Sequence, residues 1–506
     1  MKRPLLLAVD LGGTNLRATA FDTVGERVAA SVAATPHEPD APPLGRRYDP
    51  EQVWRAACQA IGEVVKAASA GDGEIVAVAA TGQRLACAFI DADGATLYLG
   101  PNTDARGVMY GWQVEEASAG ALYERTGRGM PLLFAPSRLL WLVDNQPEIA
   151  ARVERVIGLG DWMAQRLCGE AAIDLCGAVE LLVADVYTGD YWPQLWSTLG
   201  LDAAWVPRPS QPGETAGRLS AATATATGLR QGIPVAVCPP DSMAAILGSG
   251  SAAPGWTVIL AGSTMPVLAS ALSPVADPAR RTWTGRHPVA GRGVNESNGG
   301  TTGFGWAWVV EKLIGDVAGL EPAAAYQHAE RLVAATPPGA HDALAFTGGA
   351  SVMNATRPVA LLNRLRSLFW PPAYVNPAVT GGDAVRAALE AVAYSARANL
   401  EQAESARGSD HGPVVLSEGM SQSAQFTQMV ADVINRPIHR PRLAESTSVG
   451  AAMCAAVAAG VYTSVDVAAA AMTMTSVAAE PDPAAVGAYS QAYHEWRLLY
   501  EKMEAL

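Results

Sequence analysis

The stretch Leu5–Asp22, LLLAVDLGGTNLRATAFD, holds two apolar runs separated by a turn of small residues. Leu5–Val9 and Leu16–Phe21 are each short enough for a strand, and two glycines interrupt the apolar pattern between them. This pattern predicts a β-hairpin rather than a strand that leads into a helix. Because Asp10 closes the first run, the predicted turn combines a carboxylate with glycine backbone.

A turn of this kind is able to bind an anion. The backbone N–H groups of successive glycines and the hydroxyl of Thr14 would donate hydrogen bonds into one space. Asp10 would face the same space and hold a hydrated Mg²⁺, which prefers carboxylate, water and phosphate oxygens. The alternative is a plain hairpin turn without a ligand, because short motifs also match by chance. Two other phosphate-binding motifs are missing: GxxxxGK[ST] does not occur, and the glycines of the turn do not form GxGxxG.

The pattern around the hairpin predicts an α/β fold with mixed sheets. A third strand follows the hairpin, Glu51–Ala68 has the apolar spacing of an amphipathic helix, and GEIVAVAATGQ forms a buried strand that stops at Gly82. Helical patterns predominate over Arg138–Leu199 and again from Glu401 onward. The last segment, AYSQAYHEWRLLYEKMEAL, has the pattern of an exposed stretch.

The middle of the chain repeats the design of its beginning. GIPVAVCPPDSMAAILGSG predicts a strand, a turn and a helix, with Asp241 where the strand gives way to the helix. Asp241 would then act as a general base in a cleft or as a helix N-cap, and both roles are compatible. GWTVILAGSTMPVLAS next predicts a strand, a small-residue turn and another strand. We therefore expect a domain boundary near Leu247, with domains over 1–246 and 247–506 and a cleft between them.

Composition excludes several classes of partner. The net charge of −13 and the presence of only four lysines in 506 residues argue against binding to nucleic acid. The six cysteines lack metal-ligand spacing and are expected as reduced, buried residues of a cytoplasmic protein. The most apolar later stretch, VGAAMCAAVAAGVY, is fourteen residues long and too short to cross a membrane. A small metabolite is the expected partner.

These motifs together resemble the carbohydrate kinases of the FGGY family, within the actin-like ATPase superfamily. DLGGTNLR resembles the family's first phosphate motif, and RLLWLVDNQPE is similar to its Lys-x-x-Trp-Leu signature with Arg138 in the lysine place. GDWMAQRLCGEAAIDLCGA retains Asp174 of a Thr-Asp pair, and PVAVCPPDSMAAILGSG resembles the segment of the catalytic aspartate. The segment that begins LSEGMSQSAQF resembles the adenosine-binding region and is the most specific match.

The resemblance implies two actin-like, ribonuclease H-like domains, with mixed sheets flanked by helices and with ATP, Mg²⁺ and a sugar or polyol in the cleft. Residues 1–246 would supply the sugar side and 247–506 the nucleotide side, and a homodimer is a candidate assembly. Asp241 would be the base. The residues implied at the ATP phosphates and the metal are Asp10, Gly12, Gly13, Thr14 and Asn15, with Gly262, Ser263 and Thr264 in a second phosphate loop. The remaining nucleotide contacts are Gly303, Gly419 and Ser423, and the sugar contacts are Gln83, Arg84, Asp104, Arg106 and Asp241.

The chain departs from the family pattern at several positions. Glu418-Gly419-Met420 replaces paired glycines in the adenosine turn, and Arg357-Pro358 is all that remains of a Gly-Glu-Arg-x-Pro stretch. TGQR shares Gly-Gln with the xylulose kinases, whereas Leu85 matches neither them nor the glycerol kinases. We predict phosphorylation of a ketopentose such as xylulose. The alternatives are glycerol, gluconate or another polyol as acceptor, and a sugar- or nucleotide-binding actin-like module without catalysis. For Arg84 and Arg106 the alternative to sugar binding is a surface ion pair.

Overall fold

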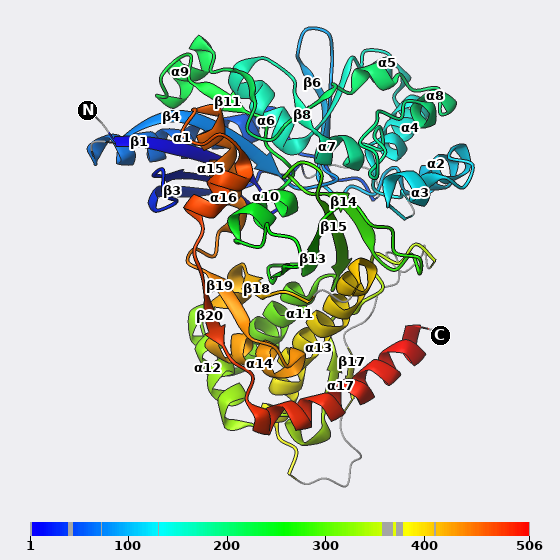
Figure 1. Ribbon diagram of the computed structural model, residues 1–506, viewed down its shortest axis with the longest axis vertical. Helices are drawn as coiled ribbons and strands as arrows, with labels where there is room; N and C mark the ends of the chain where they lie inside the picture. The colour runs from blue at the N-terminus through cyan, green and yellow to red at the C-terminus, as the bar shows by residue number, and fades with distance from the viewer. Residues whose placement is uncertain are drawn as a thin grey trace.

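A computed structural model describes residues 3–38, 44–71, 73–129, 131–356, 368–370, 378–408 and 411–504. Two mixed β-sheets organise the chain, the first in the upper half of Figure 1 and the second below it. Helices flank both sheets, as the sequence predicts for this α/β class.

The first sheet is built around the predicted hairpin. Its strand order is β10-β11-β4-β1-β2-β3, with β1 at Arg3–Leu11, β2 at Asn15–Phe21, β3 at Arg27–Ala34, β4 at Gly73–Gly82, β10 at Thr215–Arg218 and β11 at Pro234–Ala236. Strand β1 pairs antiparallel with β2 and parallel with β4, so Asp10 lies beside Thr81 at the carboxyl ends of β1 and β4. The loop after β4 therefore starts next to the hairpin turn.

The second sheet repeats this arrangement. Its order is β14-β15-β13-β12-β18-β19-β20, with β12 at Thr257–Leu260, β13 at Pro266–Ala271, β14 at Trp283–Arg286, β15 at Gly293–Asn298, β18 at Val414–Ser417, β19 at Ile438–Pro441 and β20 at Thr475–Ala479. Strands β12 and β13 form the second predicted hairpin, and β12 runs parallel to β18. The region after Glu401 is mainly helical, as the sequence predicts, and the three short strands β18, β19 and β20 lie between its helices.

Smaller sheets and the helices complete the two halves. Strands β6 (Thr96–Gly100), β5 (Cys87–Ile90) and β7 (Arg155–Gly158) form one sheet, β8 (Ile173–Asp174) pairs with β9 (Pro209–Ser210), and β16 (Leu344–Phe346) pairs with β17 (Leu368–Trp370). The earlier helices are α1 (Pro50–Ala70), η1 (Val108–Tyr110), α2 (Gly111–Ala117), α3 (Leu122–Thr126), α4 (Ala135–Asn145), α5 (Pro147–Ala150), α6 (Leu159–Cys168), α7 (Leu175–Glu180), α8 (Gln194–Thr198), η2 (Ala203–Trp205), α9 (Ala221–Thr227) and α10 (Asp241–Gly248). The later ones are α11 (Thr302–Trp308), η3 (Val309–Asp316), α12 (Pro322–Ala335), η4 (Ala340–Asp342), α13 (Gly381–Arg407), η5 (Gly419–Gln422), α14 (Ala424–Ile434), α15 (Ser446–Ala458), α16 (Val465–Met472) and α17 (Pro483–Glu504).

Helices α15 and α16 are late in the sequence yet pack beside the first sheet (Figure 1). Side chains of α15 share a core with Leu6 and Ala8 of β1. Helix α10 lies against α15 so closely that a Cβ atom at Gly450 would clash with the carbonyl oxygen of Ala244. The boundary predicted near Leu247 falls inside α10, and the division at this residue stays a prediction.

The last helix, α17, corrects the expectation of an exposed segment. Tyr489, Tyr493, Trp496 and Tyr500 are all buried, and Trp496 is 0% exposed. Their spacing of three and four residues places them on one face, while the intervening polar residues occupy the other. The high polar content of the segment concealed this apolar stripe.

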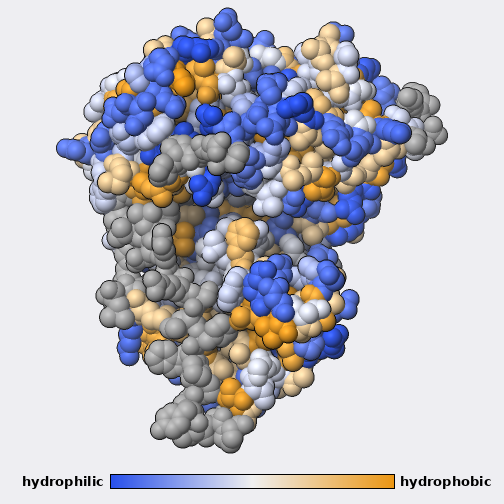
Figure 2. Space-filling model, turned by 180° about the vertical axis from the view of Figure 1, so that it is seen from behind, coloured by the Kyte–Doolittle hydropathy of each residue, from blue (hydrophilic) through white to orange (hydrophobic). Residues whose placement is uncertain are grey.

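The surface in Figure 2 mixes hydrophilic residues with scattered hydrophobic ones. Within the described part of the chain, no helix is both long and apolar enough to cross a membrane.

Candidate active site

A cavity of about 340 Å³ receives side chains from both halves of the molecule. The first half contributes Asp10 from β1, Arg84 from the loop after β4, and Asp241 from the start of α10. The second half contributes the turn between β12 and β13, Glu296 from β15, and Glu418 from the loop after β18. The two hairpins that the sequence predicts thus reach the same cavity.

Asp241 is the first residue of α10, and Pro240, not Asp241, is the N-cap. Its Oδ1 accepts hydrogen bonds from the backbone N–H groups of Ser242 at 2.7 Å and Arg84 at 3.2 Å. Burial raises the pKa of Asp241 to about 6, against the opposing effect of these two hydrogen bonds. The carboxylate is therefore mostly ionised at neutral pH and still basic enough to accept a proton.

Two further carboxylates face the cavity. Burial, followed by the charge of Asp241, raises the pKa of Asp10 to about 7, although Arg17 lies 3.8 Å from its Oδ2. Burial, followed by the charge of Asp10, raises the pKa of Glu418 to about 8. The backbone of Glu418 has φ 72° and ψ −172°, a conformation that glycine favours. Mutual repulsion among these acids favours a cation beside them.

The carboxylates fit a magnesium ion that is bound together with phosphate. In the described residues, no group of three His, Cys, Asp or Glu side chains is arranged to hold a metal ion by itself. Mg²⁺ usually takes only one or two carboxylates and completes its shell with water and substrate phosphates. Asp10, buried and close to other negative charge, suits this kind of site.

The first glycine turn is tightly constrained. The N–H of Gly12 donates to the carbonyl of Asn15 at 3.0 Å, and the carbonyl of Gly12 accepts from the Thr35 hydroxyl at 2.9 Å. A Cβ atom on Gly12 would approach the Asn15 oxygen to 2.8 Å, and one on Gly13 would clash with the Gln83 side chain. Gly12 lines the cavity, whereas Gly13, Thr14 and Asn15 complete the turn beside it.

The second turn contributes all three of its predicted residues. Gly262, Ser263 and Thr264 line the cavity, and the N–H of Gly262 donates to the carbonyl of Thr264 at 3.2 Å. Gly303 is not among the lining residues, but it packs so closely on this turn that a Cβ atom would clash with the Gly262 carbonyl. It therefore supports the turn from α11.

Glu418 and Thr447 of the predicted adenosine segment line the cavity, whereas Gly419 and Ser423 do not. Gly419 is exposed at the start of η5. Ser423 caps α14 by accepting from the N–H of Phe426 at 3.0 Å, and its hydroxyl donates to Glu330 at 2.6 Å. Nucleotide contacts at Gly419 and Ser423 stay predictions. Arg357 and Pro358 lie outside the described residues.

The predicted sugar contacts divide into two groups. Arg84 lines the cavity, and Gln83 beside it accepts from the Tyr48 hydroxyl at 3.3 Å. Asp104 and Arg106 do not line it; they form a buried pair in which Arg106 Nε donates to Asp104 Oδ2 at 2.7 Å. The alternative of surface ion pairs is wrong for both arginines, because the side chains of Arg84 and Arg106 are only 11% and 3% exposed.

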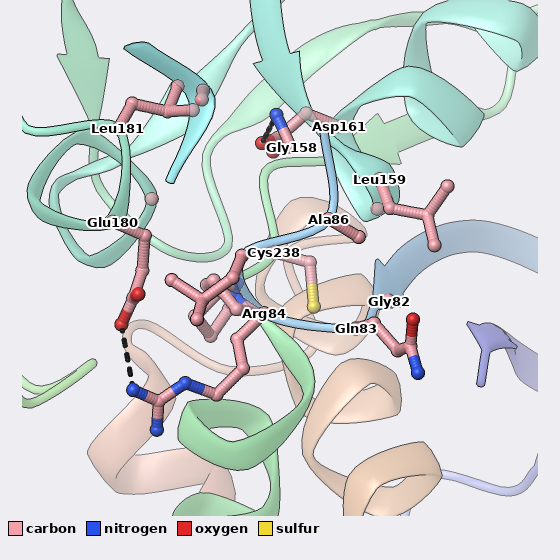
Figure 3. Close-up of a pocket in the computed structure, with 16 residues that line it drawn as sticks. Gly82, Gln83, Arg84, Ala86, Gly158, Leu159, Asp161, Glu180, Leu181 and Cys238 are labelled. Atoms are coloured by element: carbon pink, nitrogen blue, oxygen red, sulfur yellow. Dashed lines mark hydrogen bonds and ion pairs between the residues drawn. The ribbon is translucent and has the colours of Figure 1, made fainter. Parts of the chain in front are cut away.

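The buried partners of Arg84 were not predicted from the sequence. Figure 3 shows Arg84 extending from the loop after β4 toward Glu180 of α7. The same guanidinium donates a hydrogen bond to Glu296 and lies 5.2 Å from the ring centroid of Trp283. A signal exists only for Glu296, which is the one charged residue of the short strand GVNESN.

The chain is similar to known carbohydrate kinases in sequence and in fold. Residues 5–248 match the N-terminal domain model of the FGGY family of carbohydrate kinases, and residues 363–459 match its C-terminal domain model. The chain is 28% identical over 513 residues to an autoinducer-2 kinase of Salmonella paratyphi A, covering 99% of this chain and 95% of that protein. It superposes on a xylulose kinase from Rhodospirillum rubrum with a TM-score of 0.84 at 24% identity, covering 99% of both chains. A gluconate kinase from Lactobacillus acidophilus gives a TM-score of 0.83 at 17% identity, covering 99% of this chain and 98% of that one.

Proposed function

The chain belongs to the FGGY family of carbohydrate kinases, and from this premise we propose that Asp241 acts as general base in the transfer of the ATP γ-phosphoryl group to a sugar hydroxyl. Membership of the family makes the protein a phosphotransferase with the two-domain actin-like fold. The observation that carries the assignment is the position of Asp241 in a cavity that both glycine-containing turns reach.

Phosphoryl transfer depends mainly on positioning and on stabilisation of charge. Asp241 would accept the proton of the attacking hydroxyl, a role that typically contributes roughly 10²–10⁴ in rate. Its hydrogen bonds from Ser242 and Arg84 fix the carboxylate so that one oxygen remains for the substrate.

The two turns would bind the phosphates from opposite halves of the molecule. The hydroxyls of Ser263 and Thr264 are suitable donors, together with backbone N–H groups of the two turns other than those of Gly12 and Gly262, which donate within the turns. Asp10 would hold Mg²⁺ directly or through water, and the bound ion would offset negative charge that develops on the transferred group.

For the acceptor, we propose a ketopentose, with xylulose favoured. Gly82-Gln83 matches the xylulose kinases in sequence, and Leu85 supplies only apolar contact where a glycerol site would want a carboxylate. Autoinducer-2 is the second candidate, because the kinases of that name are similar to nearly the whole chain.

A panel of acceptors tests both levels of the proposal. ADP release is measured at saturating MgATP with D-xylulose, D- and L-ribulose, autoinducer-2, gluconate and glycerol. A preference of at least tenfold in kcat/KM for xylulose is expected, and the same preference for another compound reassigns the acceptor. ADP release that no acceptor stimulates would instead indicate a nucleotide-driven module.

The Asp241→Asn variant tests the base. We expect sugar-dependent ADP release to fall by about 10² or more while the Kd for MgATP changes only a few-fold, because the lost interaction belongs to the transition state. Retention of more than about a tenth of wild-type activity would contradict the role of Asp241.

A further inference from the structure

Four buried charged side chains form a network of ion pairs, and two of them, Arg84 and Glu296, line the cavity. Arg128 Nη2 lies 2.7 Å from Glu180 Oε1, the same oxygen lies 3.4 Å from Arg84 Nη2, and Arg84 donates a hydrogen bond to Glu296. All four side chains are at most 11% exposed. Both arginines are therefore ion-paired with glutamates, and neither guanidinium carries an unpaired charge.

Trp283 holds the two arginines in place. Its ring centroid is 5.2 Å from the guanidinium carbon of Arg84 and 5.1 Å from that of Arg128. Strands β14 and β15 pair so that Trp283 lies directly opposite Glu296, which puts both side chains on one face of the second sheet. The network of four charged side chains thus connects the loop after β4 to the second sheet.

The charges leave this side of the cavity negative. Arg84 and Arg128 balance Glu180 and Glu296, and Asp241 adds one further negative charge. Although burial alone would raise it, Arg128 and Arg84 hold the pKa of Glu180 below its usual value, so Glu180 remains ionised. A carboxylate on a substrate at this side would meet Asp241 and Glu296, while Arg84 and Arg128 are paired with glutamates and Arg17, the other arginine that lines the cavity, lies 3.8 Å from Asp10.

The buried polar atoms that lack a hydrogen-bond partner indicate where a ligand would form one. Glu296 Oε1 and Ser242 Oγ are buried, have no hydrogen-bond partner and belong to residues that line the cavity; Arg84 Nη2 also makes no hydrogen bond, but it is ion-paired with Glu180 at 3.4 Å. Glu296 as a residue is only 2% exposed, so a ligand is the partner that its free oxygen can meet. A hydroxyl group suits this set because it both donates and accepts, whereas a carboxylate only accepts.

We propose that the acceptor is an uncharged polyhydroxy compound, that one of its hydroxyls donates to Glu296 Oε1, and that Glu296 is the residue that discriminates against acid sugars. The proposal rests on the proposed function, since it takes this cavity to be the acceptor site. The positive charge of Arg84, taken alone, would also suit the carboxylate of a gluconate-type acid. Its ion pairs with Glu180 and Glu296 argue against that alternative.

The wild-type enzyme gives the first test. We expect kcat/KM for the best neutral acceptor of the panel to exceed that for gluconate by at least tenfold at saturating MgATP. A preference for gluconate would overturn this inference and leave the kinase assignment intact. ADP release without any acceptor dependence would remove the proposed function itself, so the two failures are distinguishable.

The Glu296→Gln variant gives the second test, because it keeps the shape of the side chain and removes its charge. We expect KM for the neutral acceptor to rise about tenfold or more, the loss expected for one charged hydrogen bond, while the Kd for MgATP stays within a few-fold. The ratio of kcat/KM for the neutral acceptor to that for gluconate should fall by a similar factor.

Glu124→Gln is the matched control, since Glu124 is half exposed and pairs with Arg280 outside the cavity. It should change none of these quantities. An unchanged acceptor-to-gluconate ratio in a folded Glu296→Gln protein would overturn the role of Glu296. If that variant does not fold, calorimetric titration of the wild type with the neutral acceptor and with gluconate decides, and tighter binding of gluconate would contradict the proposal.

Discussion

Asp10 lies near the end of β1 and Asp22 directly follows β2 in the first sheet, but the surroundings of the two aspartates differ. Asp10 is buried in the cavity, with Arg17 at 3.8 Å. Asp22 lies in an exposed turn, where its Oδ1 accepts from the N–H groups of Val24 at 3.1 Å and Glu26 at 2.8 Å. One residue is suited to a ligand and the other to holding a turn.

Asp10→Ala should therefore reduce turnover and weaken its dependence on MgATP, because it removes the carboxylate proposed for the metal. Asp22→Ala is the control and should cost only some thermal stability by loss of turn hydrogen bonds. Steady-state kinetics over a range of Mg²⁺ concentrations separates the two variants. Equal kinetic damage from both would point to a requirement for hairpin stability instead.

The raised pKa of Glu418 predicts that the stability of the ligand-free protein depends on pH. Its pKa is raised from an ordinary value of 4.5 to about 8, mainly by burial. Between these values the folded state binds more protons than the unfolded state, so this residue makes stability fall as pH rises from about 4.5 to 8. Thermal unfolding at pH 5 and pH 8 in the presence of EDTA should show a drop in Tm that Glu418→Gln makes smaller, with Glu124→Gln as the control. A drop of unchanged size would contradict the role of Glu418.

At the scale of elements, α10 connects packing to chemistry. This helix carries Asp241 at its first residue and lies against α15, where Gly450 contacts the backbone of Ala244. Because the contact involves a backbone carbonyl rather than a flexible side chain, an added methyl group must displace a helix.

Gly450→Ala should destabilise the protein by about 1–3 kcal/mol through overpacking, and should lower kcat because α10 shifts with Asp241. Gly487→Ala in α17 is the matched control: apart from its chain neighbours and the adjacent backbone of its own helix, no atom lies within 4 Å of the position that the added methyl group would take, so the same substitution should be neutral or stabilising by about 0.5–1 kcal/mol. Urea unfolding and acceptor-dependent ADP release measure both effects. Similar behaviour of the two variants would mean that the α10–α15 contact does not position Asp241.

At the scale of the whole molecule, the sequence predicted local features better than long-range ones. Both hairpins are confirmed, and the cavity that they reach includes Asp10 and Asp241, because apolar periodicity and turn residues act within about twenty positions. Glu296 meets Arg84 across 212 positions, and no local pattern encodes that pairing. The return of α15 to the first sheet was missed for the same reason.

Acceptor and nucleotide should bind cooperatively, because the cavity takes residues from both halves of the molecule. Asp241 and Arg84 come from the first half, whereas Glu296 and Glu418 come from the second, so a ligand that draws the halves together prepares the site for the other. Each ligand by itself also stabilises the folded protein: at about 100 times its Kd it adds about 2.7 kcal/mol to the free energy of unfolding. With Mg²⁺ and a nonhydrolysable ATP analogue present, calorimetric titration should show a Kd for the acceptor that is about fivefold lower or more, in the usual range of such coupling. A sugar that fails to stimulate ADP release is the control, and an acceptor Kd that is the same with and without the analogue would indicate two independent half-sites.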